Sequence, residues 1–452
     1  MPKSKSKSKR HKLSPENNNK NDRISDLPEC LLIHILSFLP TQTAMATSIL
    51  SRRWKHVWTH VPILDIESEN LDSVQSVFDQ HKAPYLQCCS LTYKFCSCCY
   101  RLVQRWINNL ASRKVEQLNL EMHTDGHKSH ESYLELPHRV FSCSTLVFLS
   151  LSGVRIDPPS SFQLPCLKKL DLYQVFYESD PFVRLLSGCP VLEDLSFDRD
   201  FSDSISIYKI YVPTLKRLSI LHHEILFDDY ADMGGLEDSE VHYAVEINAP
   251  ALEYFTFDGH LSDFVFLEKL DNLVRAKVNI CTFEPKDHEE EECHVDRVFK
   301  LLAALYNVKF LSFFTGHSEC LSNGSTYPSQ FQNLLRLDFK ANTWNWHVLQ
   351  DLLKNSPNLE VLDVTNTSTG SLLGWKKSPN DPLFLSSHLT TFYLREVKGL
   401  EHEMEFVKYI LKEAGVLKSA KIRVGNIKLK EFVREKLSKI PRRSMTCLLT
   451  VK

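Results

Sequence analysis

Residues 166–172 read CLKKLDL and residues 191–197 read VLEDLSF, and both fit one seven-residue pattern, x-Leu-x-x-Leu-x-Leu, with apolar substitutions. Twelve copies of this pattern follow one another, from KVEQLNL with central Leu118 to VLKSAKI with central Ala420. Nine of the eleven separations between central residues lie between 21 and 31 positions. Self-similarity at such a period predicts a row of similar structural units rather than one closed core.

Each copy is expected to form one short strand, because its end alternates apolar and polar residues. Five copies carry a proline two positions before their first leucine, where it ends the preceding segment. These prolines are Pro165, Pro190, Pro213, Pro250 and Pro357. The period is that of leucine-rich repeats, so we predict an α/β fold, an irregular leucine-rich-repeat solenoid with a curved parallel sheet from about residue 115 to 422. A doubly wound α/β domain is the alternative, but it needs glycine-rich turns and the chain has only 13 glycines.

A different pattern precedes the repeats, in LPECLLIHILSFLP at residues 27–40. Pro28 suits the first turn of a helix, and Glu29 complements the helix dipole. The leucines and isoleucines that follow are spaced by three and four, which predicts one continuous apolar face that stops at Pro40. TQTAMATSIL and SRRWKHVW predict two more short helices. Three helices in so short a segment are too small to bury this much apolar surface alone.

Charge is distributed unevenly along the chain. The formal net charge is −2, but residues 1–20 carry +6 and residues 408–443 carry +9, which leaves −17 for the remainder. Residues 1–22 have almost nothing apolar to bury and are predicted to be a disordered tail, either solubilising or a nuclear-import signal. No apolar run is long enough for a membrane span and no signal peptide is evident, so we expect a nuclear or cytoplasmic protein with mostly free thiols.

DRISDLPECLLIHILSFLP at residues 22–40, with SILSRRWKHVW at residues 48–58, resembles the F-box of plant F-box/leucine-rich-repeat proteins. The matching positions are Leu27, Pro28, Leu31, Leu32, Ile35, Leu36, Leu39, Pro40, Ser48, Leu50, Ser51, Arg53, Trp54 and Trp58. LLSGCPVLEDL at residues 185–195 is similar to a signature of the same family. VKYILKEAGVLKSAKI and IPRRSMTC look like the FBD module that often ends such chains. We therefore expect a three-helix F-box at 23–62, leucine-rich repeats at 63–382, and an FBD-like module at 383–452 that continues the array.

In that family the F-box binds the Skp-type adaptor of a cullin-RING ubiquitin ligase, and the repeats hold the substrate. The resemblance therefore implies a non-catalytic substrate-recognition subunit of an SCF-type ligase, with an unknown protein substrate and no metal or cofactor. The residues it assigns to adaptor binding are Leu27, Pro28, Leu31, Leu32, Ile35, Leu36, Leu39, Pro40, Leu50 and Trp54. The alternative is a leucine-rich-repeat interaction scaffold in which these helices merely cap the open end of the array.

Other kinds of chemistry find less support. Cys96 and Cys99 have the spacing of a zinc knuckle, but the Cys88-Cys89 pair is not a second knuckle, so ordinary thiols are expected. HEEEECH at residues 288–294 places its histidines six apart, which does not match the zincin motif and predicts an exposed acidic loop. No P-loop, nucleophile elbow or dinucleotide-binding glycine pattern occurs. The two basic ends of the chain favour nucleic-acid binding. The acidic remainder of the chain opposes it, because negative charge repels phosphate.

The basic tail should be dispensable for folding. Deleting residues 1–20 is expected to leave the thermal midpoint unchanged, because the tail has almost no apolar side chains to dock. The deletion is expected to lower the nuclear fraction of the protein if the tail is an import signal. Differential scanning fluorimetry and cell imaging of the two chains measure both effects. A lower thermal midpoint would contradict the prediction of a disordered tail.

Overall fold

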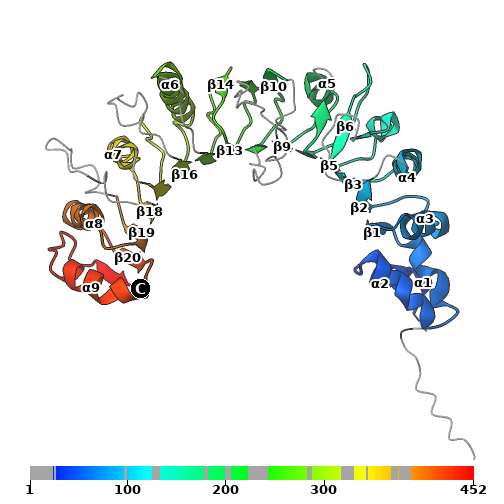
Figure 1. The fold of residues 1–452 in the computed structure, drawn as a ribbon, viewed down its shortest axis with the longest axis horizontal. Helices are drawn as coiled ribbons and strands as arrows, with labels where there is room; N and C mark the ends of the chain where they lie inside the picture. The colour runs from blue at the N-terminus through cyan, green and yellow to red at the C-terminus, as the bar shows by residue number, and fades with distance from the viewer. Residues whose placement is uncertain are drawn as a thin grey trace, which may run out of the picture.

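The computed structural model describes residues 24, 27–95, 99–124, 133–177, 182–198, 205–221, 243–281, 288–316, 330–342, 345–367, 375 and 388–452. Over these residues the chain forms an arc (Figure 1). Strands line the inner edge of the arc, and helices with two small sheets form its outer side. The first helices of the chain lie at one end of the arc, and its last helix lies at the other end.

One sheet of fifteen strands follows the inner edge, with its strands arranged in the order of the sequence. Neighbouring strands pair in parallel throughout. In order they are β1 (Ile63–Ser68), β2 (Cys88–Phe95), β3 (Gln117–Thr124), β5 (Phe148–Ser152), β7 (Lys169–Tyr173), β9 (Asp194–Asp198), β11 (Arg217–Leu221), β13 (Tyr254–Gly259), β15 (Arg275–Ile280), β16 (Phe310–Thr315), β17 (Arg336–Ala341), β18 (Val361–Asn366), β19 (Thr391–Val397), β20 (Ser419–Val424) and β21 (Leu448–Val451).

All twelve predicted repeats are strands of this sheet, from β3 to β20. The predicted curved parallel sheet with one strand per repeat is therefore confirmed. The sheet also includes β1, β2 and β21, which the repeat pattern does not reveal. In β2 the position beside the central Leu118 of β3 is taken by Cys89, so the strand lacks the leucine that defines the pattern. The sheet consequently begins at residue 63 and ends at residue 451 rather than spanning 115 to 422.

Two rows of buried side chains cross the whole sheet. In the first row the central residues of successive repeats stand side by side, as Leu149 on β5 and Leu170 on β7 do. The second row lies two positions further on, where Leu151 stands beside Leu172. All four side chains are buried, and burying one leucine contributes about 1.5–3 kcal/mol. Because the neighbouring repeats supply the contacts, each repeat depends on the next one for its stability.

The outer side of the arc covers the buried rows. Its helices are α3 (Leu71–Gln80), α4 (Tyr100–Ser112), η5 (His138–Ser142), α5 (Phe182–Ser187), α6 (His288–Ala304), α7 (Trp346–Lys354) and α8 (Glu401–Glu413). Two small parallel sheets share this side, β4 (Leu134–Glu135), β6 (Val154–Ile156) and β8 (Phe176–Tyr177), and β10 (Ile207–Tyr211), β12 (Ala244–Asn248) and β14 (Asp263–Phe266). The 3₁₀ turn η9 (Ile427–Leu429) and helix α9 (Lys430–Ser438) lie at the C-terminal end.

The segment HEEEECH was predicted to be a loop, and that prediction is wrong: it forms the first turns of α6. Downstream, Val298, Leu301 and Leu302 fall at helical spacing and are buried. Packing of this face holds the helix in place. The loop prediction weighed the charge of the segment but not the helical pattern that follows it.

The N-terminal segment forms α1 (Glu29–Leu36), α2 (Thr41–Ala46) with the 3₁₀ turn η1 (Thr47–Ile49), and η2 (Trp54–His60). The three expected helices are present, and the third is a 3₁₀ helix rather than an α-helix. Pro28 and Pro40 each stand immediately before a helix. That position suits proline, which has no N–H to leave unpaired.

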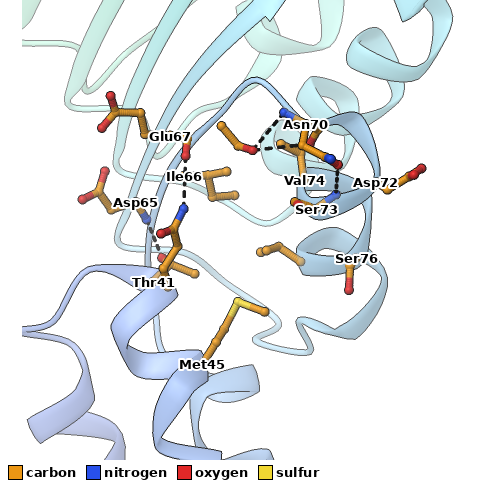
Figure 2. Close-up of a pocket in the computed structure, with 13 residues that line it drawn as sticks. Thr41, Met45, Asp65, Ile66, Glu67, Asn70, Asp72, Ser73, Val74 and Ser76 are labelled. Carbon is orange, nitrogen blue, oxygen red and sulfur yellow. Dashed lines mark hydrogen bonds between the residues drawn. The ribbon is translucent and has the colours of Figure 1, made fainter.

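These helices close the open edge of the sheet at β1, the first strand in the order. The Thr41 hydroxyl oxygen accepts a hydrogen bond from the Asp65 N–H at 2.8 Å, and the Gln42 side-chain amide donates to the Glu67 carbonyl at 3.3 Å (Figure 2). An open edge offers unpaired backbone groups to other chains, and α2 pairs two of them here. The N-terminal helices and the repeats also share one continuous hydrophobic core.

A buried histidine lies where the N-terminal helices meet the repeats. His81 has 4% of its surface exposed, and its Nε2 lies 2.9 Å from the Val61 carbonyl oxygen. Its Nδ1 lies 2.8 Å from a guanidinium nitrogen of Arg113. Burial is the main cause that lowers the pKa of His81 from its ordinary 6.5 to about 4. The neutral ring fits this site, because it can donate to the carbonyl and accept from the guanidinium.

We expect the chain to lose stability as the pH falls from 6.5 to 4. In this range the unfolded chain binds a proton that folded His81 does not, so acid favours unfolding by up to about 1.4 kcal/mol per pH unit. Burial also lowers the pKa of His294 to about 4, which adds to the same dependence. Urea unfolding at several pH values measures it. His81→Gln should flatten the slope, while His56→Gln, at an exposed histidine, should leave it unchanged; equal slopes in the two variants would contradict this assignment.

Candidate functional site

Helix α1 is apolar on two sides. Leu32 and Leu36 are four residues apart on one side and are fully buried, with 0% and 1% exposed. Leu31 and Ile35 lie about 100° further round the helix and are exposed. The predicted single apolar face is therefore wrong, because the spacings of three and four combine two separate stripes. A helix that is apolar all round is normally buried all round. The exposed outer stripe is therefore a candidate surface for contact with another protein.

The outer stripe is part of a group of exposed apolar side chains between residues 31 and 50, which we call the N-terminal apolar surface. It consists of Leu31, Ile35, Phe38, Leu39, Ile49 and Leu50. Phe38 is 74% exposed and Ile49 is 88% exposed, which is unusual for side chains of this size. Of the 18 large apolar side chains that are exposed in the described part of the chain, seven lie between residues 24 and 50. Such a concentration marks an interaction site rather than the scattered apolar residues of any protein surface.

Seven of the ten predicted adaptor-contacting residues lie at least partly at the surface, namely Leu27, Pro28, Leu31, Ile35, Leu39, Pro40 and Leu50. The other three do not. Leu32, Leu36 and Trp54 are in the core of the chain, so they have no surface to offer to another protein. They hold the N-terminal helices together and to the repeats. We correct their assignment from adaptor contact to structural core.

Two exposed residues were missed by the sequence interpretation, Phe38 and Ile49. Phe38 lies seven residues after Leu31 and three after Ile35, so it continues the outer stripe of α1 by one turn. Helical spacing alone was therefore enough to find it. Ile49 ends the turn η1, and its spacing gives no such signal. The side chain of Arg53 donates to the carbonyl of Leu27, which ties η2 to the start of α1.

A pocket of about 530 Å³ lies between α2 and the first repeat (Figure 2). Its lining combines Met45 and Ile66 with the carboxylates of Asp65, Glu67 and Asp72. Within the described residues, no group of three or more His, Cys, Asp or Glu side chains is placed to hold a metal ion. The pocket therefore offers an acidic, partly apolar recess at the junction, without a metal-binding geometry.

The thiols that raised the possibility of zinc are only partly described. Cys96 and Cys98 lie outside the described residues. Cys89 is fully buried, and burial raises the pKa of its thiol, as burial raises that of Cys189 to about 12. Both thiols are protonated at neutral pH and are therefore poor nucleophiles and poor metal ligands. No helix in the part of the chain that the structure describes is long and apolar enough to span a membrane.

The fifteen strands of the large sheet line the concave face of the arc (Figure 1). This face is made by the strand positions that alternate with the two buried rows, and these carry charge of both signs. The carboxylates of β1 to β9 are Asp65, Glu67, Glu121, Asp171, Asp194 and Asp198, against the cations Lys94 and Lys169. The cations of β15 to β20 are Arg275, Lys277, Arg336, Lys340, Arg395, Lys421 and Arg423, against Asp338, Asp363 and Glu396. The face is therefore acidic beside the N-terminal helices and basic toward the C-terminal end.

Three family models match the chain in the order of its structural parts. The F-box domain matches residues 24–65, the leucine-rich repeats of the FBD-associated F-box protein At5g56370 match residues 103–257, and FBD matches residues 380–422. The limits of 23–62, 63–382 and 383–452 that we drew from the sequence remain predictions. The strands β18 and β19 pair across residue 382, so the sheet continues from the repeats into the FBD segment.

Relatives from Arabidopsis thaliana match over almost the whole length. F-box/LRR-repeat protein 13 is 30% identical over 453 residues, which cover 95% of this chain and 96% of the relative. F-box/FBD/LRR-repeat protein At3g52680 is 31% identical over 464 residues, covering 95% and 93%. FBD-associated F-box protein At1g66310 is 31% identical over 456 residues, covering 95% and 96%.

Fold and surface together define a leucine-rich-repeat solenoid whose first repeat is joined to an F-box. The relatives that match over 95% of the chain narrow the family further. The protein belongs to the plant F-box/leucine-rich-repeat proteins with a C-terminal FBD. The resemblance drawn from the sequence is thereby confirmed, including the FBD-like end of the chain.

Truncating side chains on the two faces of α1 should have opposite consequences for stability. Leu36→Ala removes buried methyl groups from the shared core and is expected to lower the free energy of unfolding by about 2–5 kcal/mol. Ile35→Ala, one residue away on the outer stripe, should change it by no more than about 0.5 kcal/mol. Urea unfolding of both variants measures the difference. Equal losses would show that the two faces are not distinct in solution.

Proposed function

We propose that this chain is the substrate-recognition subunit of a cullin-RING (SCF-type) ubiquitin ligase, and that it has no catalytic role itself. F-box domains generally bind Skp1-type adaptors, which supports this role for residues 24–65. The observation that carries the proposal is the N-terminal apolar surface, which is exposed in the chain alone and lies within the matched F-box. The repeats, as the larger surface, would hold a protein substrate.

A capping scaffold without a ligase role is the second candidate, and one observation favours it. The N-terminal helices share a core with the repeats and pair with the edge of β1, as a cap does. A cap, however, uses only the inner face of α1, with Leu32 and Leu36. It gives no reason for the exposed apolar side chains on the outer face. The outer face therefore favours the adaptor-binding role over a cap alone.

We further propose that the protein acts in the nucleus or cytoplasm. The cysteines of the described residues are free thiols, which supports a reducing compartment. The basic tail, predicted to be either solubilising or a nuclear-import signal, lies outside the described residues. Imaging of the chain with and without residues 1–20 distinguishes the two compartments.

Placing carboxylates on the outer stripe should abolish adaptor binding without unfolding the chain. In Leu31→Asp with Ile35→Asp, two charges would enter a contact from which water is excluded, so we expect affinity for a purified Skp1-type adaptor to fall at least a hundredfold, or about 2.7 kcal/mol. Isothermal titration calorimetry measures the affinity. The thermal midpoint should change little, because both side chains are more than 40% exposed.

The matched control is Val265→Asp, because Val265 is 44% exposed, as Leu31 is, but lies on β14. This variant should bind the adaptor like the unchanged chain. Full adaptor binding by the double variant would contradict the proposed interface. Absence of adaptor binding by the unchanged chain would favour the scaffold.

A further inference from the structure

A stripe of alternating cations and aromatic rings crosses the concave face. Arg217 on β11, Tyr254 on β13, Arg275 on β15, Phe310 on β16 and Arg336 on β17 stand side by side in register. The guanidinium carbon of Arg217 lies 5.0 Å from the centre of the Tyr254 ring, and that of Arg275 lies 5.0 Å from the Phe310 ring. We call these five residues the Arg-aromatic stripe.

Stacking prepares these side chains for binding. A guanidinium over an aromatic ring is held flat, and its N–H donors remain free at the edges. Less side-chain entropy is then lost when a ligand arrives, which favours affinity. Arginine, tyrosine and other large aromatic residues are also the types that dominate binding energy in protein interfaces. The stripe has the composition and the rigidity of a recognition surface.

The cations at the two ends of the stripe are partly neutralised within the chain. Arg217 donates to the Asp194 carboxylate at 2.9 Å, and Arg336 donates to Asp338 at 2.8 Å. Arg275, in the middle, has no ion pair with a carboxylate among the described residues, and neither has its neighbour Lys277 two positions further along β15. Both side chains are exposed. Within the stripe, the unneutralised positive charge therefore lies on β15.

Further cations extend this basic region beyond the stripe. Lys340 lies 5.1 Å from the Phe314 ring on the neighbouring strand, and Lys421 lies 5.1 Å from the Tyr393 ring. They repeat the pairing of a cation with an aromatic ring on β16 to β20. The outward positions of these strands and β15 carry seven cations against three carboxylates, although the chain as a whole is slightly acidic.

We infer that the basic half of the concave face binds an acidic segment of the protein substrate, an inference that rests on the proposed role of the repeats as substrate holder. The carboxylates of the segment pair with Arg275 and Lys277, and its apolar groups lie against the partly exposed rings of Tyr254 and Phe310. Charge complementarity selects an acidic partner, because neither Arg275 nor Lys277 forms an ion pair with a carboxylate of the described residues. The acidic half of the same face, on β1 to β9, excludes the segment from the end beside the F-box.

The stripe also sets the length of the segment. Neighbouring strands are about 4.8 Å apart, so the five residues extend over roughly 19 Å. An extended peptide covers this distance with about six residues. Nucleic acid is the other polyanion that a basic and aromatic surface attracts. It is the weaker candidate, since the carboxylates on the neighbouring strands of the same face repel a long phosphate backbone.

The probe for this inference is a displayed library of random peptides of about 12 residues, long enough to span the stripe. The full-length chain alone is the bait, at about 0.15 M salt. We expect the selected peptides to be rich in Asp and Glu. Affinities of the best peptides are then measured by fluorescence anisotropy, together with a single-stranded oligonucleotide of equal charge.

Arg275→Glu with Lys277→Glu should weaken binding of the selected acidic peptides at least tenfold. The milder pair Arg275→Gln with Lys277→Gln should weaken it several-fold, and it retains the test if the charge reversal disturbs the fold. The matched control is Lys428→Glu with Lys430→Glu, which makes the same charge change on η9 and α9, outside the sheet. This control should bind the peptides like the unchanged chain.

The outcomes separate this inference from the proposed function. Selected peptides that are neutral or basic, equal loss of binding in the control, or tighter binding of the oligonucleotide would each overturn the acidic-segment assignment. None of these results affects adaptor binding, which is measured on the same preparations. A chain that binds acidic peptides at the stripe but no adaptor would support the inference about the surface and reject the ligase role.

Discussion

The structure depends on one constraint, that each repeat buries its apolar side chains only against its neighbours. A strand such as β7 contributes Leu170 and Leu172 to the two rows and has no core of its own. The sheet therefore has to be continuous, and both of its ends have to be closed. At the first end α2 pairs with the backbone of β1, and at the other end α9 buries Val433 and Leu437.

This constraint explains why the F-box helix is apolar on two sides. Its inner side, with Leu32 and Leu36, completes the core at the first edge of the array. Its outer side, with Leu31 and Ile35, is then free to serve as a binding surface. If the proposed interface is correct, one helix both closes the sheet and binds the adaptor, and a change on one side of it alters a different property from a change on the other.

Sequence patterns predict the repeated strands. They fail where a substitution hides the pattern, or where packing or strand register determines which side chains lie together. The twelve leucine patterns identify twelve strands, whereas β2 escapes because Cys89 replaces the leucine. Spacing within α1 does not separate Leu32 from Leu31, since both fit the same three-and-four pattern, and only packing shows which is inside. The Arg-aromatic stripe could not be predicted either, because Arg275 meets Phe310 only through strand pairing across 35 residues. The net charge of −17 outside the two basic ends even suggests that the region of the stripe is acidic.

The shared core between F-box and repeats also has a geometrical consequence. No flexible linker separates the two parts, since β1 begins at Ile63, directly after η2 ends at His60. Anything held on β15 is therefore eight strand-to-strand steps from the F-box, or about 38 Å along the arc. In such a rigid array, the number of repeats fixes the distance between the F-box and a bound segment. For a substrate held there, the lysines available for modification would then be chosen by their distance and direction from the binding segment rather than by the residues around them.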